Sequence, residues 1–319
     1  MPKFNAYPAA TDIASTDIFL KDTSGATGTK KVPFSVLRDA VRDVPGDPYT
    51  GIDLTVKFAT EITAAGGNPW AWIKSRITNG DFTGIHVGDY IPFTCTNQAA
   101  TQLQARIIGI NTYKNYCSTA VGNHIDFWAG LWPTKKPINP ANYNNGTSIS
   151  DHPWLASDAY LYANSLSGQV PSTAAANPTL AAKDYTSDGI YYYMPTALKN
   201  VIVEKRLMLP RRYTAGSLLT DDNNWGWASC GKVWFPTEVE VYGAPMWSGK
   251  SGYSNGGSVQ YPFFANSMNR LAFGRALWWL LSAYAGNSSY WCCIADYGPA
   301  NLNAASATNV AAPVCFRIS

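Results

Sequence analysis

The sequence predicts an α+β fold, because helix-like and strand-like patterns are mixed along one chain. In some segments apolar residues recur at steps of three and four, which is typical of amphipathic helices, whereas other segments are short apolar runs typical of strands. The 319 residues are 46% hydrophobic and 13% aromatic, so they can bury one large core or two smaller ones.

The first predicted element group is a small strand-strand-helix unit. Ile18-Phe19-Leu20 and a stretch ending at Val32 read as short strands around a glycine-rich turn. The helix that follows carries one apolar stripe, formed by Phe34, Leu37, Val41 and Val44. So short a unit cannot bury the stripe alone, so the stripe packs either on the rest of the chain or on other copies about a symmetry axis.

A domain boundary is predicted at residues 44–51, where VPGDPYTG holds two prolines and two glycines. We therefore expect the strand-strand-helix unit at residues 1–45, a linker at residues 46–59 and one mixed domain at residues 60–319.

Three helices are predicted in this domain. The first, at residues 68–80, opens with Asn as N-cap and Pro in the first turn, and places three apolar residues on one side: Trp70, Ile73 and Ile77. The second, at residues 196–205, repeats apolar residues at helical spacing from Thr196 to Lys205. The third is short and lies at residues 236–242.

Strands are predicted at residues 86–95 and 103–113, joined by a polar turn at 97–98. Residues 137–151 and 165–188 read as long irregular loops. Such loops are uncommon in a compact domain unless they are functional or mark insertions.

A further strand is predicted for YWCCI at residues 290–294. Side chains alternate between the faces of a strand, so Trp291 and Cys293 are expected inward, and Tyr290 and Cys292 on the other face.

The charge pattern argues against nucleic acid as a partner. The net charge is only +3, and the basic residues are scattered. Charged residues make up 14% of the chain, against roughly 25% in an average domain. No segment reaches the roughly 20 apolar residues of a membrane span, so no membrane insertion is expected. Residues 1–20 do not read as a secretory signal.

The six cysteines fit no metal-binding spacing and are expected to be buried free thiols. Strand pairing could bring Cys292 or Cys293 near Cys315, and the sequence leaves open whether a bridge forms.

No metal-hydrolase or nucleotide-binding motif is present. The three histidines have no metal-ligand spacing, and P-loop and HExxH patterns are absent. Glu238 lies in the first turn of a short helix, where a structural role is favoured over catalysis. The stretch at residues 221–224, Asp-Asp-Asn-Asn, is either a calcium ligand set or an exposed turn. No cofactor is expected, and a metal requirement is left open.

Two resemblances to known families follow from ordered motifs. STDIFLKDTSGATGTKKVPFSVLRDAV resembles the opening of many phage tail-fibre and virion-attached proteins. Across residues 60–319, the chain resembles the C-type-lectin-like domain of the formylglycine-generating-enzyme-related type. That resemblance rests on these motifs: HVGDYIPF, RIIGINTY, NHIDFWAG, KVWFPTEVEVYG, YPFFA, WWLLSAY, YWCCIADYG and APVCFRI. The chain departs from the family pattern at Leu281, at Ala283 and at residues 310–313.

This family includes the variable proteins of diversity-generating retroelements, in which adenine mutagenesis rewrites the C-terminal gene segment. Mutating the adenines of Asn codons cannot yield Glu, Lys, Met, Gln or Trp. These five types number 40 in the whole chain, so about five are expected in residues 280–319, where only Trp291 occurs. The depletion agrees with a variable region at residues 280–319, although a polar loop would also show it.

The resemblance implies a variable ligand-binding surface on a fixed frame. Tyrosines supply rigid contact area, and Asn, Ser and Thr supply adaptable hydrogen bonds. The predicted ligand-binding positions are Tyr284, Asn287, Ser288, Ser289, Tyr290, Cys292, Asp296, Tyr297, Asn301, Asn303, Ser306 and Thr308. The predicted frame is Trp278, Trp279, Trp291 and Phe316.

We therefore expect a phage receptor-binding or adhesion protein that is located on the virion, or alternatively on a bacterial cell surface. Its N-terminal unit would attach to a virion tail or baseplate protein, and its lectin-like surface would bind a bacterial surface protein or glycan. By analogy with fibres, a homotrimer is expected. The alternatives are a fixed-specificity carbohydrate lectin and a glycan hydrolase, which would need two carboxylates facing a cleft.

Overall fold

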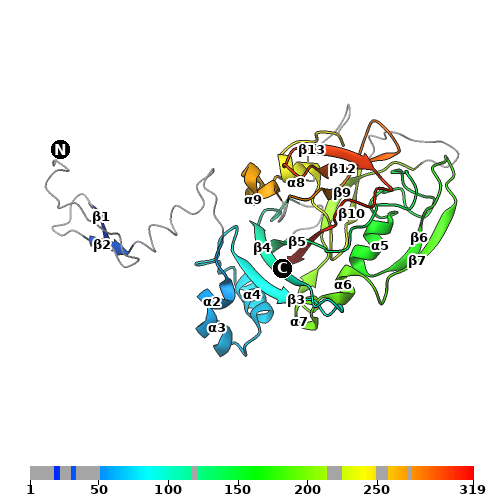
Figure 1. Cartoon of the computed structure of the whole chain (residues 1–319). Coiled ribbons are helices and arrows are strands. Elements are labelled where there is room, and N and C mark those ends of the chain that lie inside the picture. Colours follow the sequence, from blue (N-terminus) through cyan, green and yellow to red (C-terminus); the bar gives the residue numbers. More distant parts are fainter. Residues whose placement is uncertain are drawn as a thin grey trace, which may run out of the picture. The chain divides into compact units, whose positions relative to one another are not determined.

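The structure, a computed structural model shown in Figure 1, describes residues 18–21, 30–33, 51–116, 121–213, 225–248, 258–271 and 275–319. The chain divides into two compact units, residues 1–49 and residues 50–319. In the first unit, β1 (Ile18–Lys21) and β2 (Lys30–Pro33) pair as an antiparallel hairpin, which confirms the two predicted strands. The predicted helix at residues 34–44 and almost all of the predicted boundary stretch lie outside the described residues.

The second unit opens with three helices, α2 (Leu54–Lys57), α3 (Ala59–Ala64) and α4 (Pro69–Thr78). Residues 50–59, assigned to a linker from the sequence, belong to this unit, because Asp53 caps α2 and Leu54 is fully buried. The α4 helix agrees with its prediction: the Asn68 side chain accepts hydrogen bonds at its start, and its apolar residues are buried.

The core of the second unit is a five-stranded antiparallel sheet. Its order is β3 (Tyr90–Thr94), β4 (Gln102–Ile110), β5 (Ile125–Leu131), β14 (Pro313–Ile318) and β8 (Ile202–Val203). β14 therefore lies inside the sheet, paired with β5 on one side and β8 on the other. On one face, Trp70 of α4 packs edge-to-face on Phe93, Phe127 and Phe316.

A second sheet has three antiparallel strands, β11 (Trp278–Ala283), β12 (Tyr290–Ile294) and β13 (Ala300–Ala304), with β12 in the middle. The four residues assigned to the frame are fully buried. Trp278 stacks on Trp128 of β5 with ring centroids 5.6 Å apart, which joins the two sheets. The indole of Trp291 donates a hydrogen bond to the carbonyl of Leu280 at 2.7 Å.

The remaining elements connect these sheets. They are α5 (Asp158–Asn164), β6 (Ser167–Pro171), β7 (Leu180–Asp184), α6 (Ile190–Tyr193), α7 (Thr196–Lys199), β9 (Arg206–Pro210), β10 (Trp225–Ser229), α8 (Glu238–Tyr242), α9 (Pro262–Ala265) and the 3-10 helix η2 (Ser267–Arg270). Residues 137–151 have no helix or strand, as predicted. Within the described ranges, no helix is long and apolar enough to cross a membrane.

Two predictions about these elements are wrong. Residues 165–188 are not one loop, since β6 and β7 form a hairpin in which Val170 is fully buried. The predicted helix at residues 196–205 ends at Lys199, because Ile202 and Val203 pair with β14 instead. In both places pairing with a distant or neighbouring strand overrides the local pattern.

Candidate functional site

Most of the predicted ligand-binding positions lie at two ends of the three-stranded sheet, whereas Cys292, Asn301 and Asn303 lie within β12 and β13. At one end lie the β11–β12 loop (residues 284–289) and residues 305–309, which are adjacent because the Ala305 N–H donates to the Ser289 carbonyl at 2.9 Å. At the other end, Asp296 and Tyr297 occupy the turn between β12 and β13. This turn closes on Gly298, whose φ of +99° favours glycine.

Most of these positions reach solvent. The exposed side chains are Asn287, Tyr290, Asp296, Tyr297, Asn301 and Thr308, and the half-buried ones are Tyr284, Ser289, Asn303 and Ser306. Tyr290 is 42% exposed and Tyr297 is 72% exposed. The structure therefore brings Asn287, Ser289, Tyr290 and Ser306 together at one end and separates Asp296 and Tyr297 from them.

Cys292 and Ser288 are wrong as ligand-binding residues. Cys292 is fully buried because both faces of β12 are covered, and its thiol faces the carboxylate of Glu238 on α8. Burial, and to a smaller extent the Glu238 charge, raise the pKa of Cys292 well above its ordinary value. Ser288 is buried, and its carbonyl accepts the Asn144 N–H at 2.7 Å. Trp291 and Cys293 are buried as predicted.

The β11–β12 loop is held through its main-chain carbonyls. The side-chain amide nitrogen of buried Asn144 lies 3.1, 2.8 and 2.5 Å from the carbonyl oxygens of Tyr284, Asn287 and Tyr290. The guanidinium of buried Arg212 also donates to the Tyr284 carbonyl. Every residue type has a carbonyl, so these contacts fix the loop without using its exposed side chains.

The neighbouring segment is anchored from the same part of the chain. The side-chain oxygen of Asn142 accepts from the N–H and hydroxyl of Ser306, and the Asn139 N–H donates to the Ala305 carbonyl. Residues 139–144 thus support both parts of the candidate surface. The sequence predicts an irregular loop for this segment. Its dense run of Asn was the only signal of an anchoring role.

Asn301 and Asn303 also have a structural role. Their side-chain oxygens accept the N–H groups of Leu302 and Ala304 on their own strand, each at 2.9 Å. Because β13 is at the edge of its sheet, these amides cover two main-chain donors that would otherwise face solvent.

Residues 246–248 lie directly beside the β11–β12 loop. The Ala285 N–H donates to the Trp247 carbonyl at 2.9 Å, and the Trp247 and Tyr284 rings meet edge-to-face with centroids 6.1 Å apart. Fully buried Glu238 accepts the N–H groups of all three residues of this segment. The α8 helix that carries Glu238 has a capping box between Thr237 and Glu240. It ends before Gly243 as predicted and begins at Glu238, directly after the Pro236-Thr237 pair predicted to open it.

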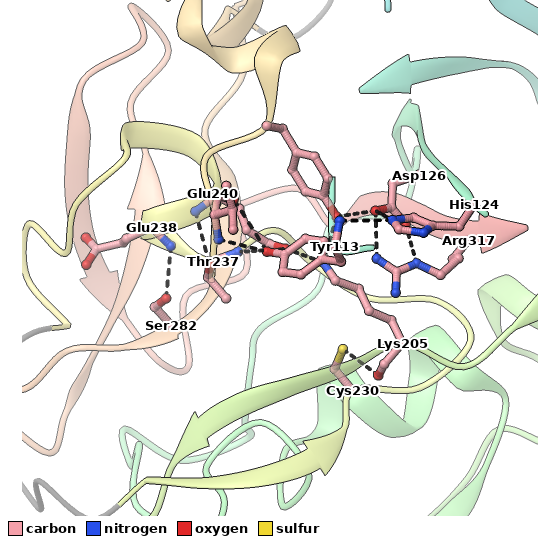
Figure 2. A network of polar contacts seen from close by, with 12 residues as sticks. Tyr113, His124, Asp126, Lys205, Cys230, Thr237, Glu238, Glu240, Ser282 and Arg317 are labelled. Carbon is pink, nitrogen blue, oxygen red and sulfur yellow. Dashed lines mark hydrogen bonds and ion pairs between the residues drawn. The ribbon is translucent and has the colours of Figure 1, made fainter. Parts of the chain in front are cut away.

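A separate polar network is enclosed in the core (Figure 2). Arg317 of β14 donates two hydrogen bonds to Asp126 of β5, at 2.7 and 2.8 Å. Asp126 also accepts from the Tyr261 hydroxyl at 2.9 Å, and Tyr261 in turn accepts from Lys205 at 2.8 Å. Lys205 pairs with Glu240 of α8.

The charges in this network are balanced and inaccessible. Lys205 and Arg317 face Asp126 and Glu240, and all four side chains are almost fully buried. Burial raises the pKa of Asp126, but the charge and hydrogen bonds of Arg317, together with the charge of Lys205, outweigh burial and hold this pKa at about 2. A ligand cannot reach these groups, so the network links the large sheet to α8 rather than forming a catalytic site.

His124, at the edge of this network, is neutral. Burial lowers its pKa, against a smaller opposing effect of Asp126. Its Nε2 accepts the Tyr113 N–H at 3.0 Å, so Nδ1 carries the proton toward the Gly122 carbonyl.

The described ranges contain neither a metal-binding cluster nor a disulfide. No three His, Cys, Asp or Glu side chains there are placed to hold a metal ion. Cys95, Cys230, Cys292, Cys293 and Cys315 are buried free thiols. Cys117 and the Asp-Asp-Asn-Asn stretch at residues 221–224 lie outside the described residues.

A scan against protein-family models finds no match to this sequence. Searches of curated proteins and of solved structures also find none. The resemblances noted from the motifs therefore stay predictions.

Proposed function

We propose that this chain is a phage receptor-binding or adhesion protein, in which a C-type-lectin-like domain displays a diversified surface to a bacterial cell-surface protein or glycan. The observation that carries the proposal is the attachment of the β11–β12 loop. Asn144 and Arg212 hold it through main-chain carbonyls, while Asn287 and Tyr290 point into solvent. Such a loop can exchange its side chains and keep its backbone.

The residue types in the region support the same proposal. Trp291 alone belongs to the set that adenine mutagenesis of Asn codons cannot produce, and it is fully buried as part of the core. The exposed positions beside it carry Asn, Tyr, Asp and Thr, which adenine mutagenesis can produce or alter.

The N-terminal unit is proposed to attach the protein to a virion tail or baseplate protein. The assembly is proposed to be a homotrimer, which would raise avidity for a bacterial surface. Light scattering of the full chain at micromolar concentration should give three times the chain mass, and a monomer would contradict this part of the proposal. A location on a bacterial cell surface is the alternative to the virion.

Side-chain exchange tests the binding surface. The variants Asn287→Ser and Tyr290→Ser should keep the unfolding temperature within about 2 °C, because exposed substitutions change stability little. Labelled protein should bind intact cells from a panel of bacteria, and both variants should change the strength or range of that binding. If either substitution unfolded the domain, the loop could not be a variable surface.

The neighbouring DNA tests diversification separately. A near-copy of the codons for residues 280–319, differing at adenines and lying beside a reverse transcriptase gene, is the expected finding. Its absence would remove diversification and leave ligand binding in place.

A fixed-specificity lectin is the second candidate, and a groove on the large sheet favours it. The groove has a volume of about 720 Å³ across β3, β4 and β5, and its polar side chains are Thr94, Gln102 and Gln104. These uncharged donors and acceptors suit sugar hydroxyls. Glycan-array binding that is lost in Gln102→Ala and Gln104→Ala, and is unchanged in Tyr290→Ser, would favour this candidate.

A further inference from the structure

Two large apolar side chains are exposed next to the β11–β12 loop. Met246 is 56% exposed and Trp247 is 42% exposed. A single exposed apolar residue needs no explanation, but these two are consecutive and adjoin the Tyr284 ring and the Ala285 N–H. They extend the candidate surface beyond residues 280–319.

Glu238 fixes the backbone that presents them. Its fully buried carboxylate accepts the N–H groups of Met246, Trp247 and Ser248 at distances between 2.7 and 3.2 Å. A carboxylate in the interior is costly unless hydrogen bonds satisfy its oxygens. Moving this segment would remove those bonds, so Met246 and Trp247 stand on a rigid support.

We propose that Met246 and Trp247 form a constant apolar anchor for a protein partner, beside the exchangeable side chains of the loop. This inference rests on the proposed function and names the class of partner. A tryptophan held in place before binding loses little conformational freedom on association, and tryptophan is enriched among the residues that dominate protein interfaces. Methionine adds adaptable apolar contact but no group that hydrogen-bonds well to sugar hydroxyls.

The residue types fit a constant role. Met and Trp are two of the five types that adenine mutagenesis of Asn codons does not produce, and both residues lie outside residues 280–319. An anchor of this kind would give every variant the same apolar contact, while the loop decides which partner is accepted.

The rigid support can be tested without a partner. Amide hydrogen exchange should show protected N–H groups at residues 246–248, and Glu238→Gln should speed their exchange at least tenfold. The matched control Glu204→Gln changes an exposed carboxylate that accepts a hydrogen bond from the Ser229 hydroxyl. It should leave the exchange rates of residues 246–248 unchanged. Unprotected N–H groups at residues 246–248 in the unaltered chain would overturn the inference.

The anchor itself is tested with labelled full-length protein on intact cells from a panel of bacteria. Trp247→Ala and Met246→Ala should each weaken binding at least tenfold. Met268→Ala, which truncates an equally accessible methionine on η2, should stay within twofold of the unaltered chain. Protease treatment of the cells should abolish binding, and periodate oxidation of their glycans should not.

The outcomes separate this inference from the function on which it rests. If the unaltered chain binds but Trp247→Ala binds equally, or if periodate abolishes binding and protease does not, the protein-directed anchor is wrong and ligand binding stands. If the unaltered chain binds no cell, the proposed function is contradicted and the anchor falls with it.

Discussion

Asp126 and Arg317 show how much the core relies on single residues. Their two parallel hydrogen bonds join β5 to β14, and their charges are compensated only inside the network. Removing one partner of such a pair leaves a buried charge that water cannot reach, which costs far more than an exposed pair contributes.

Asp126→Asn should therefore lower the free energy of unfolding by about 3–5 kcal/mol. The matched control is Asp151→Asn, which breaks the exposed pair with Arg211 at 3.0 Å and should cost about 1 kcal/mol or less. Urea unfolding monitored by tryptophan fluorescence measures both values. Equal costs for the two variants would show that the buried pair has no special role.

Asn144→Ala should loosen the β11–β12 loop. It removes the donor to the carbonyls of Tyr284, Asn287 and Tyr290, and we expect the free energy of unfolding to fall by about 2–3 kcal/mol. Asn287→Ala is the control, because that side chain is exposed and accepts the Ser289 N–H, so the loss of stability should stay below about 1 kcal/mol. Hydrogen exchange should rise at residues 284–290 and stay unchanged in the 295–299 turn, and an unchanged loop would refute the anchoring role.

At the scale of elements, the sequence predicts structure well where the deciding residues lie close together. The α4 helix has its cap and proline within two residues, and α8 has its capping box within four. β8 was misassigned because its two residues are decided by β14, more than a hundred residues away. Likewise, alternation in β12 identified one buried face correctly but carried no information about α8, which covers the other.

The candidate site was predictable only in part, for the same reason. The residue composition of 280–319 and the order of the family motifs pointed to the exposed residues around β12. These signals lie in the residue types themselves, since Asn, Ser and Tyr are typical of adaptable binding surfaces. The supports were not predictable: Asn144 acts about 140 residues ahead of its partners, and Trp247 meets Tyr284 only through the fold.

The edge of β13 carries a prediction of its own. Replacing both covering amides, in Asn301→Ala/Asn303→Ala, should free two outward N–H groups and promote pairing with a second copy of the chain. Analytical ultracentrifugation should show a larger or concentration-dependent species relative to the unaltered chain. Asn309→Ala, at an exposed position after β13, is the control. An unchanged distribution would mean that the edge is protected in another way.

At the scale of the whole molecule, acid should lower the free energy of unfolding of the domain in two phases. Burial lowers the folded-state pKa of His124 below its ordinary 6.5, so the unfolded chain binds more protons there and stability falls as pH drops below 6.5. Asp126 has a folded-state pKa of about 2 against 3.8, so its contribution of about 2 kcal/mol is present above pH 3.8 and is lost between pH 3.8 and 2.

Unfolding free energies measured between pH 8 and 2 test this order. The Asp126→Asn variant should keep the first decline and lack the second. A second phase that persists in that variant would assign the acid sensitivity to other carboxylates.

The position of β14 has a consequence for how altered copies would be screened. The strand is the last element of the predicted variable region, residues 280–319, yet it lies in the interior of the large sheet and supplies Arg317 to Asp126. A premature stop codon or a shifted reading frame anywhere in residues 280–312 would remove β14. The buried carboxylate of Asp126 would then lose its partner Arg317. Under the proposed diversification, only copies with an intact reading frame would fold. Folding would therefore eliminate copies in which rewriting of the gene segment introduced a stop codon or a frameshift.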